Sequence, residues 1–89
     1  MGAALELIIT RQAEKDLAGL PAKVRSGILQ SMIVIAADPF APHPNVRPMV
    51  GHADTFRLRK GDWRAIYVVS REAITVTLVQ AGHRREIYR

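Results

Sequence analysis

"TFRLRKGDWRAIYVV", residues 55–69, decides the fold of this chain, because it predicts two strands joined by a tight turn. The first half alternates apolar with basic residues, and the second half, "DWRAIYVV", is rich in aromatic and β-branched residues that favour strands. Lys60 and Gly61 form the predicted turn, where glycine supplies the positive φ that a short β-hairpin connection requires. The segment therefore predicts an antiparallel hairpin.

Side-chain alternation then assigns faces to the first strand. Phe56 and Leu58 point to one side, which we expect to be the core, so Arg57 and Arg59 point to the other. Arg64 lies just past the turn on the neighbouring strand, and whether it joins them depends on a hairpin register that alternation does not fix. The two strand arginines are also compatible with an ordinary solvated sheet face, and Arg64 with pairing to Asp62 or Glu72.

Outside the hairpin, the sequence predicts one strand and two helices before it and one strand after it. "LELII" (5–9) is a short apolar strand, and Thr10 can cap a helix through "RQAEKDLAGL" (11–20). A second helix starts at Pro21 and stops at Asp38-Pro39. A proline-rich extended connector, 38–53, leads to the hairpin, and "AITVTLVQAG" (73–82) supplies the last strand.

These elements predict a single α+β domain over residues 1–89, of order β-α-α-β-β-β. A helical hairpin covers one face of the sheet, and Gly27 would let its two helices approach closely. Ile33 and Val34 lie off the main apolar stripe of the second helix. Either more of the sheet covers them, which is the preferred interpretation, or they form a surface that another chain covers.

Composition bounds the class of protein. The 89 residues contain no cysteine, which excludes disulfides and thiolate metal sites and fits a cytoplasmic location. The longest apolar run, "MIVIAA" (32–37), is too short to span a membrane, and "MGAALELII" (1–9) lacks the basic start of a signal peptide. The connector histidines, His43 and His52, make an unconvincing metal site without further ligands, so we expect neither a metal nor a cofactor.

The net charge of +5 lies in the last third of the chain. Residues 1–56 carry equal numbers of basic and acidic side chains, whereas residues 57–89 carry eight basic and three acidic ones. A localised basic patch is typical of proteins that bind an anionic partner, most often nucleic acid, although a clustered solubility charge gives the same count. The basic residues of this segment are Arg57, Arg59, Lys60, Arg64, Arg71, Arg84, Arg85 and Arg89.

Guanidinium groups suit a phosphodiester substrate. Arginine stays protonated, binds phosphate through a planar fork and can stabilise the charge that grows in a phosphoryl transition state. It is a poor general base, so His83 is the candidate proton shuttle and Tyr88 a candidate acid or stacking partner. Both come from "GHRREIYR" (82–89), at the end of the last strand.

Two motifs resemble those of a known family. "GDWRAIYVV" (61–69) followed by "AGHRREIYR" (81–89) closely resembles the RelE/ParE superfamily of toxin–antitoxin toxins. "RQAEKDLAGLP" (11–21) is similar to the family's first helix, and "MVGHADTFRLRKGDWR" (49–64) to the frame around its hairpin. The resemblance covers almost the whole chain.

The resemblance implies a RelE-type fold and an endoribonuclease that enters the ribosomal A site and cuts mRNA. In that chemistry a 2′-hydroxyl attacks the adjacent phosphate. By position, Arg64 and Arg84 are expected on the scissile phosphate and Tyr88 against the base. Further phosphate-binding residues are expected at Arg57, Arg59, Lys60 and Arg85. The family archetype carries lysines, one of them the presumed base, where this chain has Arg57 and Arg59, so His83 is the substitute base.

The resemblance also implies a partner, a small antitoxin with an acidic or amphipathic segment, forming a hetero-oligomer with the toxin. Ile33 and Val34 are the expected docking points for it. Two other functions stay open at this stage. One is the ParE type of toxin, which inhibits DNA gyrase and cleaves no RNA, and the other is a non-enzymatic RNA- or DNA-binding module.

Overall fold

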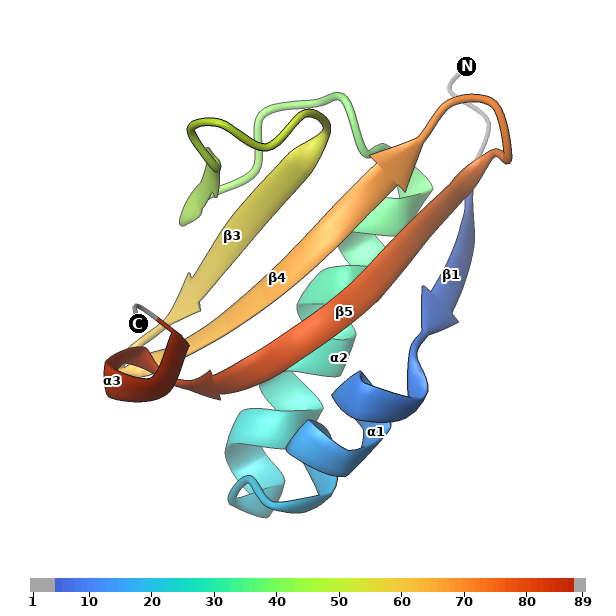
Figure 1. Cartoon of the computed structure of the whole chain (residues 1–89). Coiled ribbons are helices and arrows are strands. Elements are labelled where there is room, and N and C mark those ends of the chain that lie inside the picture. The colour runs from blue at the N-terminus through green and yellow to red at the C-terminus, as the bar shows by residue number, and fades with distance from the viewer. Residues whose placement is uncertain (1–4, 88–89) are drawn as a thin grey trace.

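A computed structural model describes residues 5–87 as a five-stranded sheet with helices (Figure 1). The order of elements confirms the predicted β-α-α-β-β-β arrangement and adds a short strand in the connector and a short helix near the C-terminus. The elements are β1 (Glu6–Ile9), α1 (Arg11–Ala18), α2 (Ala22–Ala37), β2 (Val46–Pro48), β3 (Thr55–Lys60), β4 (Trp63–Ser70), β5 (Thr75–His83) and α3 (Arg84–Ile87).

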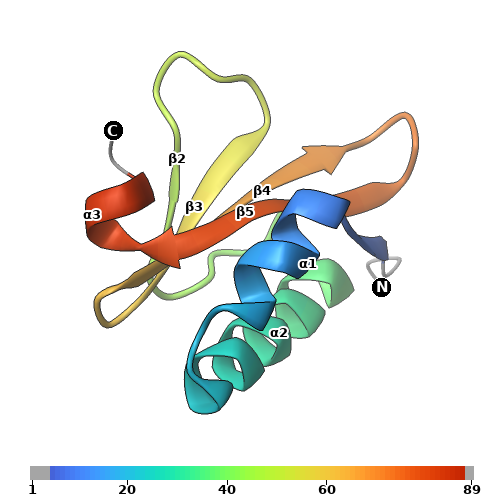
Figure 2. The ribbon, with the colours of Figure 1, turned by 60° about the horizontal axis from the view of Figure 1, so that its bottom comes forward.

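The sheet has the strand order β1-β5-β4-β3-β2, so the hairpin lies near its centre. β1 runs parallel to β5, and the other neighbours are antiparallel. Both α1 and α2 lie on one face, which leaves the other face open, as Figure 2 shows. α3 lies at the end of β5 on the side away from α1 and α2 (Figure 2).

Local signals in the sequence set the ends of the helices. The Oγ1 of Thr10 accepts a hydrogen bond from the Ala13 backbone N–H at 3.1 Å, which confirms the predicted cap. α2 ends where Asp38 leaves helical geometry before Pro39, as predicted. The expected close approach at Gly27 is wrong, because a Cβ at this position would meet nothing within 4 Å.

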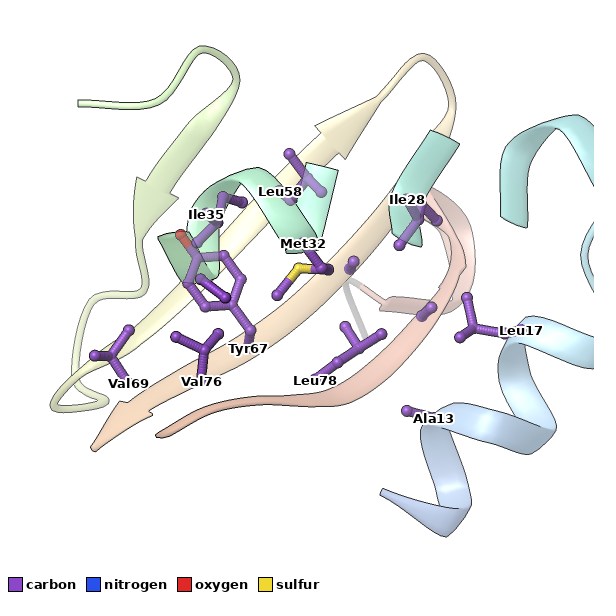
Figure 3. Packing of buried hydrophobic residues seen from close by; sticks show 13 residues of the cluster. Ala13, Leu17, Ile28, Met32, Ile35, Leu58, Tyr67, Val69, Val76 and Leu78 are labelled. Carbon is purple, nitrogen blue, oxygen red and sulfur yellow. The ribbon is translucent and has the colours of Figure 1, made fainter. Parts of the chain in front are cut away.

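The core lies between the helices and one face of the sheet (Figure 3). Ile28, Met32 and Ile35 project from α2 onto Leu58 of β3 and onto the inward side chains of the two central strands. Tyr67 is almost fully buried there and stacks on Phe56, with ring centroids 5.4 Å apart. Burial raises the pKa of Tyr67 to about 12, because the interior disfavours the charged phenolate.

One expectation about the second helix is wrong. The sheet does not cover Ile33 and Val34, which are 55% and 54% exposed, because they lie on the side of α2 that faces away from the core. The extended connector also contains a strand that the sequence did not predict, since Val46–Pro48 pairs with β3 and forms the edge of the sheet. Within residues 5–87, no helix is long and apolar enough to cross a membrane.

Candidate functional site

Arginines from three strands share the open face of the sheet. Leu58 is 3% exposed and faces the helices, so alternation confirms that Arg57 and Arg59 point the other way. The register resolves the position of Arg64, since it stands directly opposite Arg59 across the β3–β4 hairpin. Residues directly opposite in an antiparallel pair project to the same face. Arg64 therefore joins the other two.

A fourth arginine comes from the edge strand. Arg47 of β2 stands directly opposite Arg57. It was not among the residues predicted from the sequence, because the connector showed no strand periodicity. The signal that was present is the triplet "VRP" (46–48), whose valine could pack on the core while its arginine faced outward.

These four arginines line one hollow of about 480 Å³, which we call the arginine hollow. Asn45 and Val46 complete the lining, and no carboxylate is among the described residues that form it. Asn45 has a positive φ of 63°, a conformation that asparagine tolerates better than most residues. Its carbonyl accepts a hydrogen bond from the Arg59 backbone N–H at 2.8 Å, which ties the residue before β2 to β3.

Arg64 is the most buried of the four, with 7% of its surface exposed. Its Nη1 donates to the Gly61 carbonyl at 2.7 Å and to the Trp63 carbonyl at 2.9 Å. Gly61 has a φ of 60°, as predicted for the turn. These two hydrogen bonds hold the guanidinium against the hairpin turn and so restrict its position.

The start of α3 is tied to the same turn. The Arg84 backbone N–H donates to the Asp62 carbonyl at 2.8 Å, and the Arg84 Nε lies 3.8 Å from the Asp62 Oδ1. Gly82 stands opposite Arg64, and a Cβ there would touch Ile87 at 3.6 Å, so α3 packs beside the arginine hollow. Arg84 borders the turn but is not among the lining residues, and Arg85 is exposed on α3.

The structure does not bring His83 and Lys60 into the arginine hollow. His83 stands opposite Trp63 and contacts its ring edge-on at 5.3 Å, on the helix side of the sheet. It lines a separate hollow of about 430 Å³ beside Lys15 and Asp16 of α1. Its Nδ1 accepts the Arg85 backbone N–H at 3.2 Å, which is compatible with a proton on Nε2 when the ring is neutral.

Lys60 also points to the helix side, since it follows Leu58 by two residues, and it lines a groove against α2. Tyr88 lies outside the described residues. Among residues 5–87, no group of three or more potential metal ligands occurs.

The four guanidinium groups of the arginine hollow are permanently positive. The hollow can therefore hold a strongly anionic ligand, such as a polynucleotide backbone.

Comparison with known proteins agrees with this architecture. The chain is 28% identical over 81 residues to the toxin RelG of Mycobacterium tuberculosis, which covers 90% of this chain and 91% of that protein. The isolated RelE toxin of E. coli has the same fold, with 22% identity, a TM-score of 0.79 and coverage of 96% of this chain and 92% of that one.

A second solved structure is the RelBE2 toxin–antitoxin complex of Mycobacterium tuberculosis. It has 24% identity and a TM-score of 0.76, and covers 92% of this chain and all of that one. The sequence also matches, over residues 7–88, the family described as "ParE toxin of type II toxin-antitoxin system, parDE". The chain therefore belongs to the ParE toxin family of type II toxin–antitoxin systems, within the RelE/ParE superfamily.

Proposed function

We propose that this toxin is a ribosome-dependent endoribonuclease that cleaves mRNA through the arginine hollow. The observation that carries the proposal is the convergence of Arg47, Arg57, Arg59 and Arg64 from three strands on one hollow. Four guanidinium groups in one place complement a phosphodiester backbone, and the proposed target lies in the cytoplasm.

In the proposed reaction the 2′-hydroxyl of one nucleotide attacks the adjacent phosphorus, and the bond from phosphorus to the 5′-oxygen of the next nucleotide breaks. The products are a 2′,3′-cyclic phosphate and a 5′-hydroxyl. The proton of the 2′-hydroxyl leaves to a base, and the 5′-oxygen takes up a proton. Arg59 and the buried Arg64 would stabilise the charge that develops on the phosphate oxygens.

The roles of the C-terminal residues are part of the same proposal. Arg84 is assigned to the scissile phosphate and Tyr88 to the base, whereas Arg85 would contact the backbone from outside the hollow. His83 fits the role of general base poorly, because it lies on the helix side of the sheet. Lys60 fits direct phosphate binding poorly for the same reason.

The decisive experiment adds purified toxin to ribosomes stalled on a defined mRNA and maps cleavage by primer extension. Arg59→Gln should slow cleavage roughly 10²- to 10³-fold, as expected for the loss of one preorganised donor. Arg71→Gln is the matched control, since Arg71 stacks over Phe40 and is not among the residues that line the hollow. A substrate with a 2′-deoxynucleotide at the cleavage site should stay intact. Uncut wild-type substrate would refute the proposal.

The second candidate function is inhibition of DNA gyrase, which the match to the ParE family favours. This reading predicts loss of supercoiling by gyrase in the presence of the toxin, with ribosome-bound mRNA left intact. A supercoiling assay run beside the cleavage assay separates the two functions. Salt-sensitive RNA binding without cleavage or gyrase inhibition would instead identify a binding module.

We propose further that the toxin binds a cognate antitoxin through the outer face of α2. Val34 lines an apolar groove of about 260 Å³ between α2 and the connector, and Ile33 is exposed beside Val34 in the helix. Lys60 lies at the rim of this groove and would attract an acidic side chain. Toxin–antitoxin complexes are known for structurally similar proteins, among them RelBE2 of Mycobacterium tuberculosis.

Ile33→Asp tests this docking surface in a titration of antitoxin against toxin. The substitution should weaken the complex by tenfold or more, because it places a charge in an apolar contact. Ile74→Asp is the matched control, because Ile74 is 57% exposed in the β4–β5 turn. Unchanged affinity for Ile33→Asp would exclude Ile33 from the interface.

A further inference from the structure

A pocket of about 280 Å³ lies between the connector and the helix side of the sheet, and we call it the connector pocket. Its walls are residues 39–43 of the connector, Val46 and Pro48 of β2, and Phe56 and Tyr67 of the two central strands. Most of this lining is apolar, and none of the described residues that form it carries a permanent charge. The connector pocket therefore differs in chemistry from the arginine hollow.

The walls of the connector pocket are stiff. Pro39, Pro42 and Pro48 line it, and a proline ring fixes the backbone φ of its residue. On the sheet side, Tyr67 stands directly opposite Phe56, and the two rings stack. A ligand that enters between such walls orders few protein groups, so little of the binding free energy is lost to conformational entropy.

The hydroxyl of Tyr67 is the polar group that the fold leaves without a partner in this pocket. Tyr67 is 1% exposed, and its ring extends from β4 into the layer between the sheet and the helices (Figure 3). Buried tyrosine hydroxyls usually form a hydrogen bond, but that of Tyr67 forms none with the described residues. Every fully enclosed polar side-chain atom of residues 5–87 has a partner, so the Tyr67 oxygen is not fully enclosed. It therefore opens onto the pocket that Tyr67 lines.

The chemistry of this hydroxyl restricts the ligand. Its pKa of about 12 keeps it protonated at neutral pH, so it can donate one hydrogen bond and accept others. Apolar walls with one convergent polar group are typical of sites for small organic molecules. The apolar walls disfavour an ion, because they offer it no compensating charge. Size also fits, since an apolar protein cavity of about 150 Å³ takes up benzene.

We propose that the connector pocket binds a small neutral molecule with one or two apolar rings and one hydrogen-bonding group, which the Tyr67 hydroxyl recognises. The rings occupy the space between the connector prolines and the stacked Phe56 and Tyr67 rings. This site is separate from the surface proposed for RNA. The proposal does not rest on the nuclease function.

Phenol and toluene are the probes, because they have nearly the same shape and only phenol can form a hydrogen bond. Each is titrated into ¹⁵N-labelled toxin, and amide chemical shifts are followed at Ala41 and Val46, which line the pocket. Phenol should produce saturable shifts with a Kd of about 1 mM or tighter, as for a small ligand with few atoms. These shifts should be largest around the connector pocket.

Tyr67→Phe removes the hydroxyl and keeps the ring. Because this hydroxyl has no partner among the described residues, the variant should fold, which circular dichroism checks. Phenol should bind about three- to tenfold more weakly to it than to wild type, the value of one hydrogen bond. Toluene affinity should stay within about twofold, since toluene forms no hydrogen bond with the hydroxyl.

A second variant tests the space itself. Ala41→Leu places a larger apolar side chain at the wall of the pocket and should weaken binding of both probes. Ala73→Leu is the matched control, because Ala73 is exposed in the β4–β5 turn and is not among the residues that line the pocket. It should leave both affinities unchanged.

Three outcomes would overturn the inference. The first is the absence of saturable shifts around the pocket with phenol at about 10 mM, where a site with a Kd of 1 mM is about 90% occupied. The second is equal phenol affinity in wild type and Tyr67→Phe, which would mean that the hydroxyl keeps water as its partner. The third is equal weakening of phenol and toluene by Tyr67→Phe, which would show a general change of the pocket.

Discussion

Replacing Arg47 with glutamine should stabilise the folded toxin in the absence of nucleic acid. Arg47 is exposed and stands directly opposite Arg57 on the open face of the sheet. Two unit charges about 7 Å apart repel by about 0.6 kcal/mol at the dielectric constant of water. This value falls within the range of about 0.2–1 kcal/mol for cross-strand pairs. Glutamine keeps two methylene groups of the aliphatic stem and a polar end, and it removes the charge.

The gain should appear as a rise in Tm of about 2–5 °C, measured by thermal denaturation in about 10 mM salt. At about 1 M salt the screening length falls to about 3 Å, so the difference between Arg47→Gln and wild type should nearly vanish. Thermal denaturation followed by far-ultraviolet circular dichroism, at both salt concentrations, measures both effects.

Arg71→Gln tests whether any stabilisation comes from less local repulsion between two arginines or from a lower net charge of the whole protein, which is +5. It removes the same charge but breaks the contact of the Arg71 guanidinium with the Phe40 ring, 4.4 Å from its centroid. This variant should lose about 0.5–1 kcal/mol. Stabilisation by both variants would show that net charge alone matters, and no stabilisation by Arg47→Gln at low salt would refute the reasoning from opposed arginines.

Three further predictions concern Arg84, the buried Tyr67 and the helix cap at Thr10. Arg84→Ala should slow mRNA cleavage roughly 10²- to 10³-fold, as expected for the loss of one phosphate-binding donor. It should change the free energy of unfolding by no more than about 1 kcal/mol, because the ion pair of Arg84 with Asp62 is exposed. The cleavage assay and chemical denaturation measure the two effects. Burial raises the pKa of Tyr67 from 10.0 to about 12, so its stabilising contribution is present below pH 10 and lost as pH rises towards 12, at most about 2–3 kcal/mol. Tyr67→Phe should flatten this alkaline loss in urea titrations at pH 9 to 12, and an unchanged slope would contradict the assignment. Thr10→Ala should cost about 1 kcal/mol in urea denaturation, because the Ala13 N–H loses its side-chain acceptor, whereas Thr10→Ser should keep most of the stability.

Local information in the chain accounts for much of this fold. Alternation in the strand before the turn placed Leu58 in the core and Arg59 on the open face, because successive side chains of any strand point to opposite sides. Thr10 capped α1 and Gly61 adopted a positive φ in the hairpin turn, since both depend on the backbone within a few residues. The position of Lys60 also follows from local geometry, because a residue two positions after the buried Leu58 points to the same, helix side of the sheet.

Tertiary structure alone decided which distant residues meet. Arg47 entered the site because three connector residues, without periodicity of their own, found hydrogen-bonding partners on the exposed edge of β3. His83 lies outside the arginine hollow because the β4–β5 register sets it opposite Trp63, on the helix side of the sheet. A shift of one residue in that register would have placed it on the other face. Faces within a strand follow from covalent geometry, whereas register follows from packing and hydrogen bonding summed over the whole sheet. The arginine hollow depends on register and therefore on the complete fold.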